Sequence, residues 1–248
     1  MRKKYKLTKE TKTFLDGMVL HRIRAVRDFV LANGTEVHAG DFGGWVEKED
    51  NLSHCGGAWV EGGALIFDKA RVEDEALVCD NARVYSNAQI GGRARVYGRA
   101  RIYGKAWIND NAQIGGEVLV FGNAQVYGNA WVYNNALVYD NAQIFGKAEV
   151  CEKTEVFGKV EVWGNAQIYG NARVCNIHDY AVFKNTWSSG RYFTYTSSNK
   201  MWKVGCFYGT GEELIAKAYR DSELSCRCYT AIVRAQEAVE KAIIGDTE

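Results

Sequence analysis

The chain has no proline among its 248 residues, although average usage would place about twelve in this length. Proline cannot donate a backbone hydrogen bond, so it is kept out of strands that are paired on both sides. Histidine is also scarce, and no histidine lies between His54 and His178. The missing proline favours extensive strand pairing, and half of the chain lacks the residue most often used in acid–base catalysis.

Neither sign of charge is in excess. The chain carries 31 basic and 30 acidic residues, for a formal charge of +1, so nucleic acid and acidic membranes are unlikely partners on electrostatic grounds. No apolar run is long enough for a membrane span, and MRKKYKLTKETK lacks the apolar core of a signal peptide. Seven cysteines without zinc-ligand spacing predict reduced thiols and no metal site. We therefore expect a cytoplasmic protein.

A six-residue repeat runs through the middle of the chain. Every sixth residue from Val60 to Val174 is Val or Ile, at twenty consecutive positions. Ala stands two residues before it in seventeen cases, and Gly, Asp or Asn stands two residues after it in eighteen. A fixed short period of this kind dictates the fold before any local propensity does.

Each repeat predicts one short strand and one corner. Ala and Val two positions apart lie on the same face of a strand, turned inward together. The Gly, Asp or Asn that follows adopts positive φ at low cost, as a sharp corner requires. Frequent Gly-Asn pairs exclude a helix, and strands this short exclude a meander of hairpins. Three repeats then form one triangular coil, and the chain is mainly β, with about six to seven coils stacked in parallel.

Motifs such as NARVYSNAQIGG, FGNAQVYGNAWVYNNA and WGNAQIYGNARV resemble the bacterial hexapeptide-repeat family over roughly residues 40–176. The resemblance implies a single-stranded, parallel, left-handed β-helix. It also suggests CoA-dependent acyl transfer, with a histidine acting as general base near a cleft between subunits of a trimer. This chain departs from that plan, since its middle has no histidine and no loop interrupts the repeat.

The repeat region, residues 51–182, is flanked by two other segments. Residues 1–50 predict an N-terminal β-rich cap over the first coil, with Asp16-Gly17 as a hairpin turn. Residues 183–248 predict a small C-terminal α+β module that packs against the column. In this module, RYFTYT and MWKVGCFY form a hairpin, and Thr210 with Glu213 forms a capping box before a helix of about ten residues. A longer helix, about 223–244, is expected to bury one stripe: Cys228, Ile232, Ala235, Val239 and Ile243.

The weak catalytic candidate is His178 followed by Asp179, at the last coil. A carboxylate that orients an imidazole would make a general base. Under that hypothesis acetyl-CoA or another acyl-CoA would be the cosubstrate; otherwise no cofactor is expected. The alternative interpretation, which we favour, is a polar residue where the column ends.

An aromatic stripe is the candidate surface for protein contacts. One outward position repeats every eighteen residues and is aromatic six times in succession: Phe67, Tyr85, Tyr103, Phe121, Tyr139 and Phe157. Rings one strand apart can stack. A continuous apolar stripe is also more than a monomer normally leaves bare. We expect the C-terminal module, an identical subunit or a protein partner to cover it.

A cluster of cations is the candidate anion site. Within RARVYGRARIYGK lie Arg93, Arg95, Arg99, Arg101 and Lys105. Charge runs are usually solvated faces, but a belt of arginines beside aromatic rings could bind a small anion or a nucleotide.

The uninterrupted repeat favours a non-catalytic binding or scaffolding protein. In this hypothesis the rigid column and the C-terminal module make protein–protein contacts, either with a second copy in a homo-oligomer (a trimer or a dimer) or with a partner complex that is inhibited. A CoA-dependent acyltransferase is the first alternative, and a binder of a small anionic ligand is the second.

Overall fold

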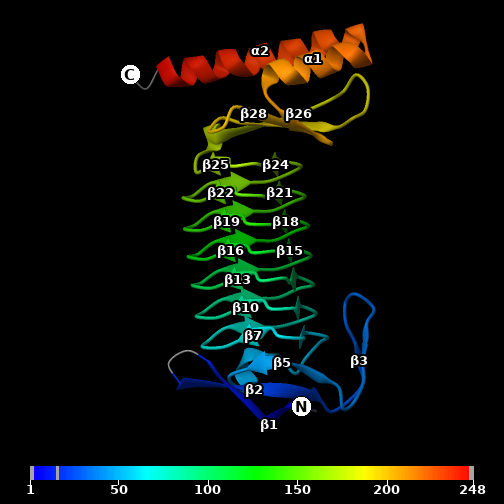
Figure 1. Cartoon of the computed structure of the whole chain (residues 1–248), viewed down its shortest axis with the longest axis vertical. Coiled ribbons are helices and arrows are strands. Elements are labelled where there is room, and N and C mark those ends of the chain that lie inside the picture. Colours follow the sequence, from blue (N-terminus) through cyan, green and yellow to red (C-terminus); the bar gives the residue numbers. More distant parts are fainter. Residues whose placement is uncertain (1–2, 15–16, 246–248) are drawn as a thin grey trace.

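The repeat region winds into a column of three parallel β-sheets (Figure 1). The computed structural model describes residues 3–14 and 17–245. Each two-residue strand pairs in parallel with the strand 18 residues farther along, as Gln89 does with Trp107. Three strands complete a coil, and the column has about seven coils, which confirms the predicted parallel β-solenoid.

We name the three sheets of the column by number. Face 1 contains β7 (Leu65–Ile66), β10 (Arg83–Val84), β13 (Arg101–Ile102), β16 (Leu119–Val120), β19 (Leu137–Val138), β22 (Glu155–Val156) and β25 (Arg173–Val174). Face 2 contains β8 (Arg71–Val72), β11 (Gln89–Ile90), β14 (Trp107–Ile108), β17 (Gln125–Val126), β20 (Gln143–Ile144) and β23 (Glu161–Val162). Face 3 contains β6 (Trp59–Val60), β9 (Leu77–Val78), β12 (Arg95–Val96), β15 (Gln113–Ile114), β18 (Trp131–Val132), β21 (Glu149–Val150) and β24 (Gln167–Ile168).

Stacked aliphatic side chains fill the inside of the column. The repeated Val and Ile residues are no more than 1% exposed, and the Ala residues that precede them are fully buried. Each such Val or Ile contributes about 1.5–3 kcal/mol through burial. The residues two positions after them turn the corners at positive φ, for example 55° at Asp110 and 70° at Gly128, except Asn176 at the end of the column. The inward and corner positions therefore match the predicted pattern.

N-terminal strands extend face 1 downward. β1 (Tyr5–Phe14) and β2 (Met18–Ala25) pair antiparallel, as predicted, and Asp16 of the expected turn lies outside the described residues. β5 (Phe42–Val46) joins β2 to β7, pairing with β7 in parallel. The small hairpin of β3 (Phe29–Val30) and β4 (Glu36–Val37) projects sideways, and the 3-10 turn η2 (Glu49–Asn51) leads into the first coil.

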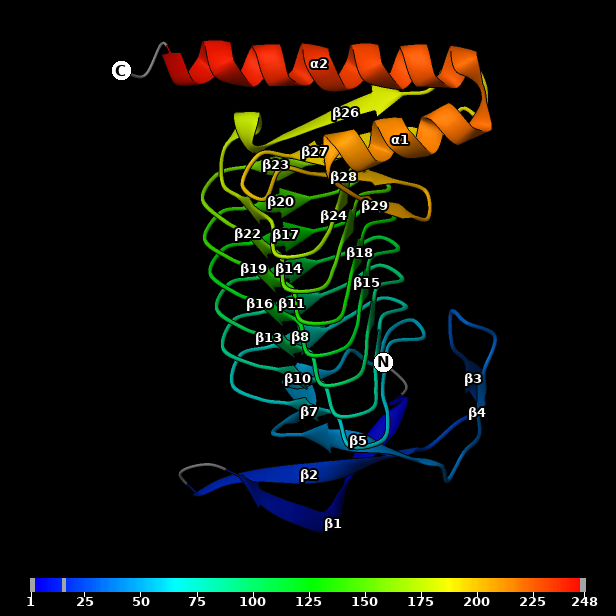
Figure 2. The same ribbon diagram turned by 45° about the horizontal axis from the view of Figure 1, so that its top comes forward.

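The C-terminal module lies across the upper end of the column (Figure 2). After the 3-10 turn η3 (Ile177–Asp179), an antiparallel sheet orders β26 (Tyr180–Lys184), β27 (Tyr192–Thr196), β28 (Met201–Val204) and β29 (Phe207–Gly209). Helices α1 (Gly211–Asp221) and α2 (Glu223–Gly245) cover the side of this sheet that faces away from the column. The Thr210 side chain accepts a hydrogen bond from Glu213 N–H at the start of α1, which confirms the predicted capping box.

The predicted buried stripe of α2 is partly wrong. Val239 is 52% exposed and Ala235 is also exposed, whereas Val233 and Gln236 are buried. Val233 belongs to the cluster that contains Phe193 of the module's sheet. Ala, Val and Ile recur on two neighbouring stripes of this helix, so periodicity alone does not select the buried one. Packing against the sheet selects the stripe through Val233.

Candidate functional site

Side chains close the lower ends of the sheets. A sheet edge leaves backbone N–H and C=O groups without partners, and these need hydrogen bonds from elsewhere. Lys4 Nζ donates to Gly56 O at 3.2 Å and to Ala58 O at 2.6 Å, below face 3. Asn51 Nδ2 donates to Ala70 O at 2.9 Å, below face 2. The chain thus supplies long polar side chains where the column begins.

Side chains of the C-terminal module close two of the upper ends. On face 3, the N–H of Gln167 donates to Thr194 Oγ1 at 2.9 Å. On face 1, the N–H of Arg173 donates to Ser198 Oγ at 2.8 Å. In each case a hydroxyl oxygen takes the place of the carbonyl that another coil would have offered.

The upper end of face 2 is closed only in part. β23 is the last strand of this face, and Tyr180 Oη donates to Glu161 O at 2.9 Å. Burial raises the pKa of Tyr180, and this effect outweighs the hydrogen bond from the Trp163 backbone N–H, which lowers it. The phenol therefore keeps the proton that it donates to Glu161 O. Within residues 3–14 and 17–245, the backbone N–H groups of Lys159 and Glu161 have no acceptor. Two donors therefore remain available on the edge of β23.

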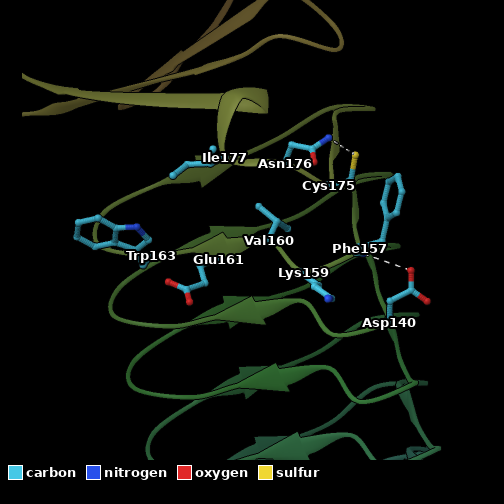
Figure 3. A pocket seen from close by; sticks show the side chains of 10 residues that line it. Asp140, Phe157, Lys159, Val160, Glu161, Trp163, Cys175, Asn176 and Ile177 are labelled. Carbon is cyan, nitrogen blue, oxygen red and sulfur yellow. Dashed lines mark hydrogen bonds between the residues drawn. The ribbon is translucent and has the colours of Figure 1, made fainter.

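A cavity of about 790 Å³ lies at this position, below η3 (Figure 3). Its lining combines rings, aliphatic side chains and charges, including Phe157, Lys159, Val160, Glu161, Trp163 and Ile177. A second cavity of about 470 Å³ adjoins it, because Trp163 and Ile177 line both. The volumes are in the range of protein sites that bind small ligands or peptide segments.

Large apolar side chains border the cavity and face solvent. Trp163 is 58% exposed and Ile177 is 77% exposed. Val182 of β26, beside the second cavity, is also exposed. Clustered exposed apolar groups mark contact surfaces more often than single ones do. We call the group Phe157, Val160, Trp163, Ile177 and Val182 the upper apolar surface.

The predicted aromatic stripe forms a continuous ring stack along the corner between faces 1 and 2. Neighbouring centroids are 5.0–5.1 Å apart and the ring planes differ by 3–7°. The stack is mostly half-buried, and the N-terminal Phe14 contacts its lowest ring, Phe67, at 5.5 Å. The C-terminal module lies above the column and not along this corner (Figure 1). The expected cover by that module is therefore corrected: the N-terminal strands cover one end of the stack.

A second ring stack lies along the corner between faces 2 and 3. Tyr127 and Phe145 stack at 5.0 Å, and Phe145 and Trp163 at 6.5 Å. The two stacks flank face 2 and end at Phe157 and Trp163, on either side of the cavity. In the eighteen-residue pattern of the sequence only the first stack is continuous. Ile177 follows the last repeat and belongs to no pattern, so no sequence signal marks it.

His178 and Asp179 are not arranged as an acid–base pair. Asp179 Oδ2 accepts hydrogen bonds from the backbone N–H groups of Cys175 at 2.7 Å and Asn176 at 2.8 Å. His178 is exposed on η3, and no hydrogen bond joins it to Asp179 in the described part of the chain. The carboxylate ends face 1 by capping a turn, which is a structural role.

The five cations of the candidate anion site are distributed around the column. Arg95 lies on face 3 and Arg101 on face 1. Arg99 pairs with Glu117 of the next coil at 3.3 Å. The other two lie on separate corners, Arg93 between faces 2 and 3 and Lys105 between faces 1 and 2. The fold therefore brings these side chains to one level of the column but not to one site.

Within residues 3–14 and 17–245, no group of three or more His, Cys, Asp or Glu residues is placed to hold a metal ion. No helix there has the length and apolar character needed to cross a membrane.

Comparison with protein families identifies the repeat. Three segments of the column are similar to the family model described as YdcK Beta solenoid repeat: residues 94–110, 124–140 and 166–176. No curated protein matches the chain. The repeat match and the three stacked parallel sheets both agree with the β-solenoid fold that the resemblance implied.

Proposed function

We propose that this protein is a non-catalytic binding or scaffolding protein that holds a protein partner on the upper apolar surface. The observation that carries the proposal is the 790 Å³ cavity between Phe157 and Trp163, at an upper sheet end of the described column where the N–H groups of Lys159 and Glu161 have no acceptor. The close-packed column below it is a rigid support, because its aliphatic interior is fully buried.

The composition of the surface supports a protein as the ligand. Aromatic and aliphatic side chains border it, and its charged groups are one basic residue, Lys159, and two acidic ones, Asp140 and Glu161. Protein interfaces have apolar centres with aromatic anchors and polar rims. A small anion would be expected to select a site with a net positive charge.

Cross-linking in cells tests the proposal. A photoreactive residue at Ile177 is expected to give one cross-linked species of defined mass, at native expression level. Val30, which is 56% exposed near the opposite end, is the matched control position and should not give that species. Trp163→Ala should weaken the Ile177 cross-link. Equal cross-linking from both positions, or none from Ile177, contradicts the proposal.

Calorimetry with acetyl-CoA separates this function from acyl transfer. We expect no measurable binding by the wild-type protein. Tight binding that is lost in His178→Ala would replace the proposal with the acyltransferase hypothesis. Binding of a small anion that is lost in the double variant Arg95→Glu, Arg101→Glu would favour the cation belt instead.

A further inference from the structure

We propose that the upper end of face 2 accepts an extended segment of the partner, which pairs in parallel with β23 as an additional strand of the sheet. The inference rests on the proposed function and specifies the backbone conformation of what is bound. The column itself shows the contacts that such a strand would make, because every lower strand of face 2 already has a neighbour above it.

The backbone donors match the carbonyl spacing of an extended chain. One coil below, Asn141 N–H donates to Gly158 O at 2.8 Å, and Gln143 N–H donates to Val160 O at 2.9 Å. Lys159 and Glu161 are the equivalent residues one coil higher. Their N–H groups lack acceptors within the described residues, and two donors two residues apart along an edge fit alternate carbonyls of an added strand.

The other upper sheet ends use side chains in place of such a strand. Hydroxyl oxygens of Thr194 and Ser198 accept from faces 3 and 1. On face 2, Tyr180 packs against the core and donates to Glu161 O. It closes the half of the strand position that follows Glu161, so the open half runs from Gly158 to Glu161. Unpaired edges recruit strands, and this one is bordered by apolar groups.

The side chains at the open half define the partner's sequence character. Val160 lies on the floor of the cavity, so a small or aliphatic residue of the partner should face it (Figure 3). The position one coil above Phe157 is already taken by Cys175, since a Cβ at Gly158 would meet Cys175 O at 3.2 Å. The fitting partner is therefore a short extended segment with a small or aliphatic residue opposite Val160.

A peptide with the sequence of residues 140–143, DNAQ, with both termini blocked, is the probe, because these residues lie one coil below Gly158–Glu161 and the peptide would place its alanine opposite Val160. Binding of the fluorescent peptide is measured by anisotropy, with a scrambled peptide as control. Glu161→Pro removes one edge donor, and an edge strand tolerates proline where its N–H faces outward. Glu161→Ala, which keeps the N–H, is the matched control.

We expect Glu161→Pro to bind the peptide at least tenfold more weakly than Glu161→Ala does, because both variants lack the carboxylate and only the proline variant also lacks the N–H. Amide hydrogen exchange of the wild type gives a second readout that does not depend on the folding of a variant. The peptide should slow exchange at Lys159 and Glu161 and leave Gln143, which is already paired, unchanged.

Three results would overturn the inference. The wild type does not bind the peptide at millimolar concentration; it binds without protecting Lys159 and Glu161; or the edge is occupied by a second copy, shown by light scattering as a dimer that Glu161→Pro abolishes. If the Ile177 cross-link persists in Glu161→Pro, strand pairing is rejected while the proposed protein-binding function remains.

Discussion

The carboxylate of Asp110 accepts a hydrogen bond at 3.0 Å from the backbone N–H of Gly128, one coil above it. Asp110 is at positive φ on its corner, and so is Gly128. The same relationship recurs in four other corner pairs: Asp68 with Ser86, Asp74 with Gly92, Asp80 with Gly98, and Asp140 with Gly158. An aspartate at a corner therefore links successive coils in addition to turning the chain.

Replacing Asp110 tests this link. Asp110→Gly removes the hydrogen bond without backbone strain and should lower the free energy of unfolding by about 1 kcal/mol. Asp110→Ala should lower it further, by about 1–2 kcal/mol more, because alanine is disfavoured at positive φ. Asp110→Asn keeps an acceptor and should be nearly neutral. Urea unfolding measures all three, and equal stability of the glycine variant and the wild type would refute a contribution from the carboxylate.

Thr154 occupies a buried position where most repeats have Ala, and its Oγ1 has no partner in the described structure. Thr154→Val keeps the shape of the side chain and removes the unpaired hydroxyl. We expect the free energy of unfolding to rise by about 1 kcal/mol. Thr154→Ser keeps the hydroxyl and should not stabilise. A valine variant that melts below the wild type would contradict this explanation.

Val126 and Gln125 lie on the same strand and point to opposite faces, with Val126 fully buried. Val126→Asp places an unpaired charge in the interior, at a cost of several kcal/mol, so we expect the variant to be unfolded or insoluble. Gln125→Asp introduces the same charge outside and should remain folded. Circular dichroism of the soluble fraction decides, and a folded Val126→Asp protein would show that the inward assignment is wrong.

Tyr103 stacks between Tyr85 and Phe121, at 5.0 Å from each ring centroid. Tyr103→Ala removes two ring contacts and should lower the free energy of unfolding by about 2 kcal/mol. Tyr219→Ala changes an exposed ring on α1 and should alter stability by less than about 0.5 kcal/mol. If both substitutions have the same small effect in urea unfolding, the stack does not stabilise the column.

Burial, assisted by the neighbouring charge of Arg27, lowers the pKa of Lys4 from 10.5 to about 8. Between pH 8 and pH 10.5 the Lys4 amine is neutral in the folded protein and still protonated in the unfolded chain. The free energy of unfolding therefore rises with pH across this window. As pH falls back through 8, the folded protein takes up the proton and this gain is lost. Compared with Lys4→Met, the wild type should gain about 3 kcal/mol of relative stability across this window.

Urea unfolding of both proteins at pH 7 and pH 10 measures the effect. The difference between wild type and Lys4→Met cancels the other groups that titrate in the same range, such as the buried cysteines. A difference that does not change with pH would mean that Lys4 keeps an ordinary pKa in the folded protein.

The candidate site divides into a part that the repeat predicts and a part that it does not. Phe157 and Trp163 recur at fixed positions of the eighteen-residue coil, so the pattern places one on each side of face 2. Ile177 and Tyr180 follow the last repeat, and only the fold brings them over β23. Likewise, the adjacent residues His178 and Asp179 resemble a catalytic pair in the sequence, but the chain folds Asp179 back onto Cys175 N–H.

The sequence by itself determined the column. Each repeat carries its own strand, its inward pair and its corner, and contacts between coils follow from stacking identical units. The closure of the column was decided by tertiary structure, because it depends on pairs far apart in the chain, such as Lys4 with Ala58 and Thr194 with Gln167. No periodicity encodes such pairs. The open edge of β23 is the place where these long-range contacts stop short of completing a sheet.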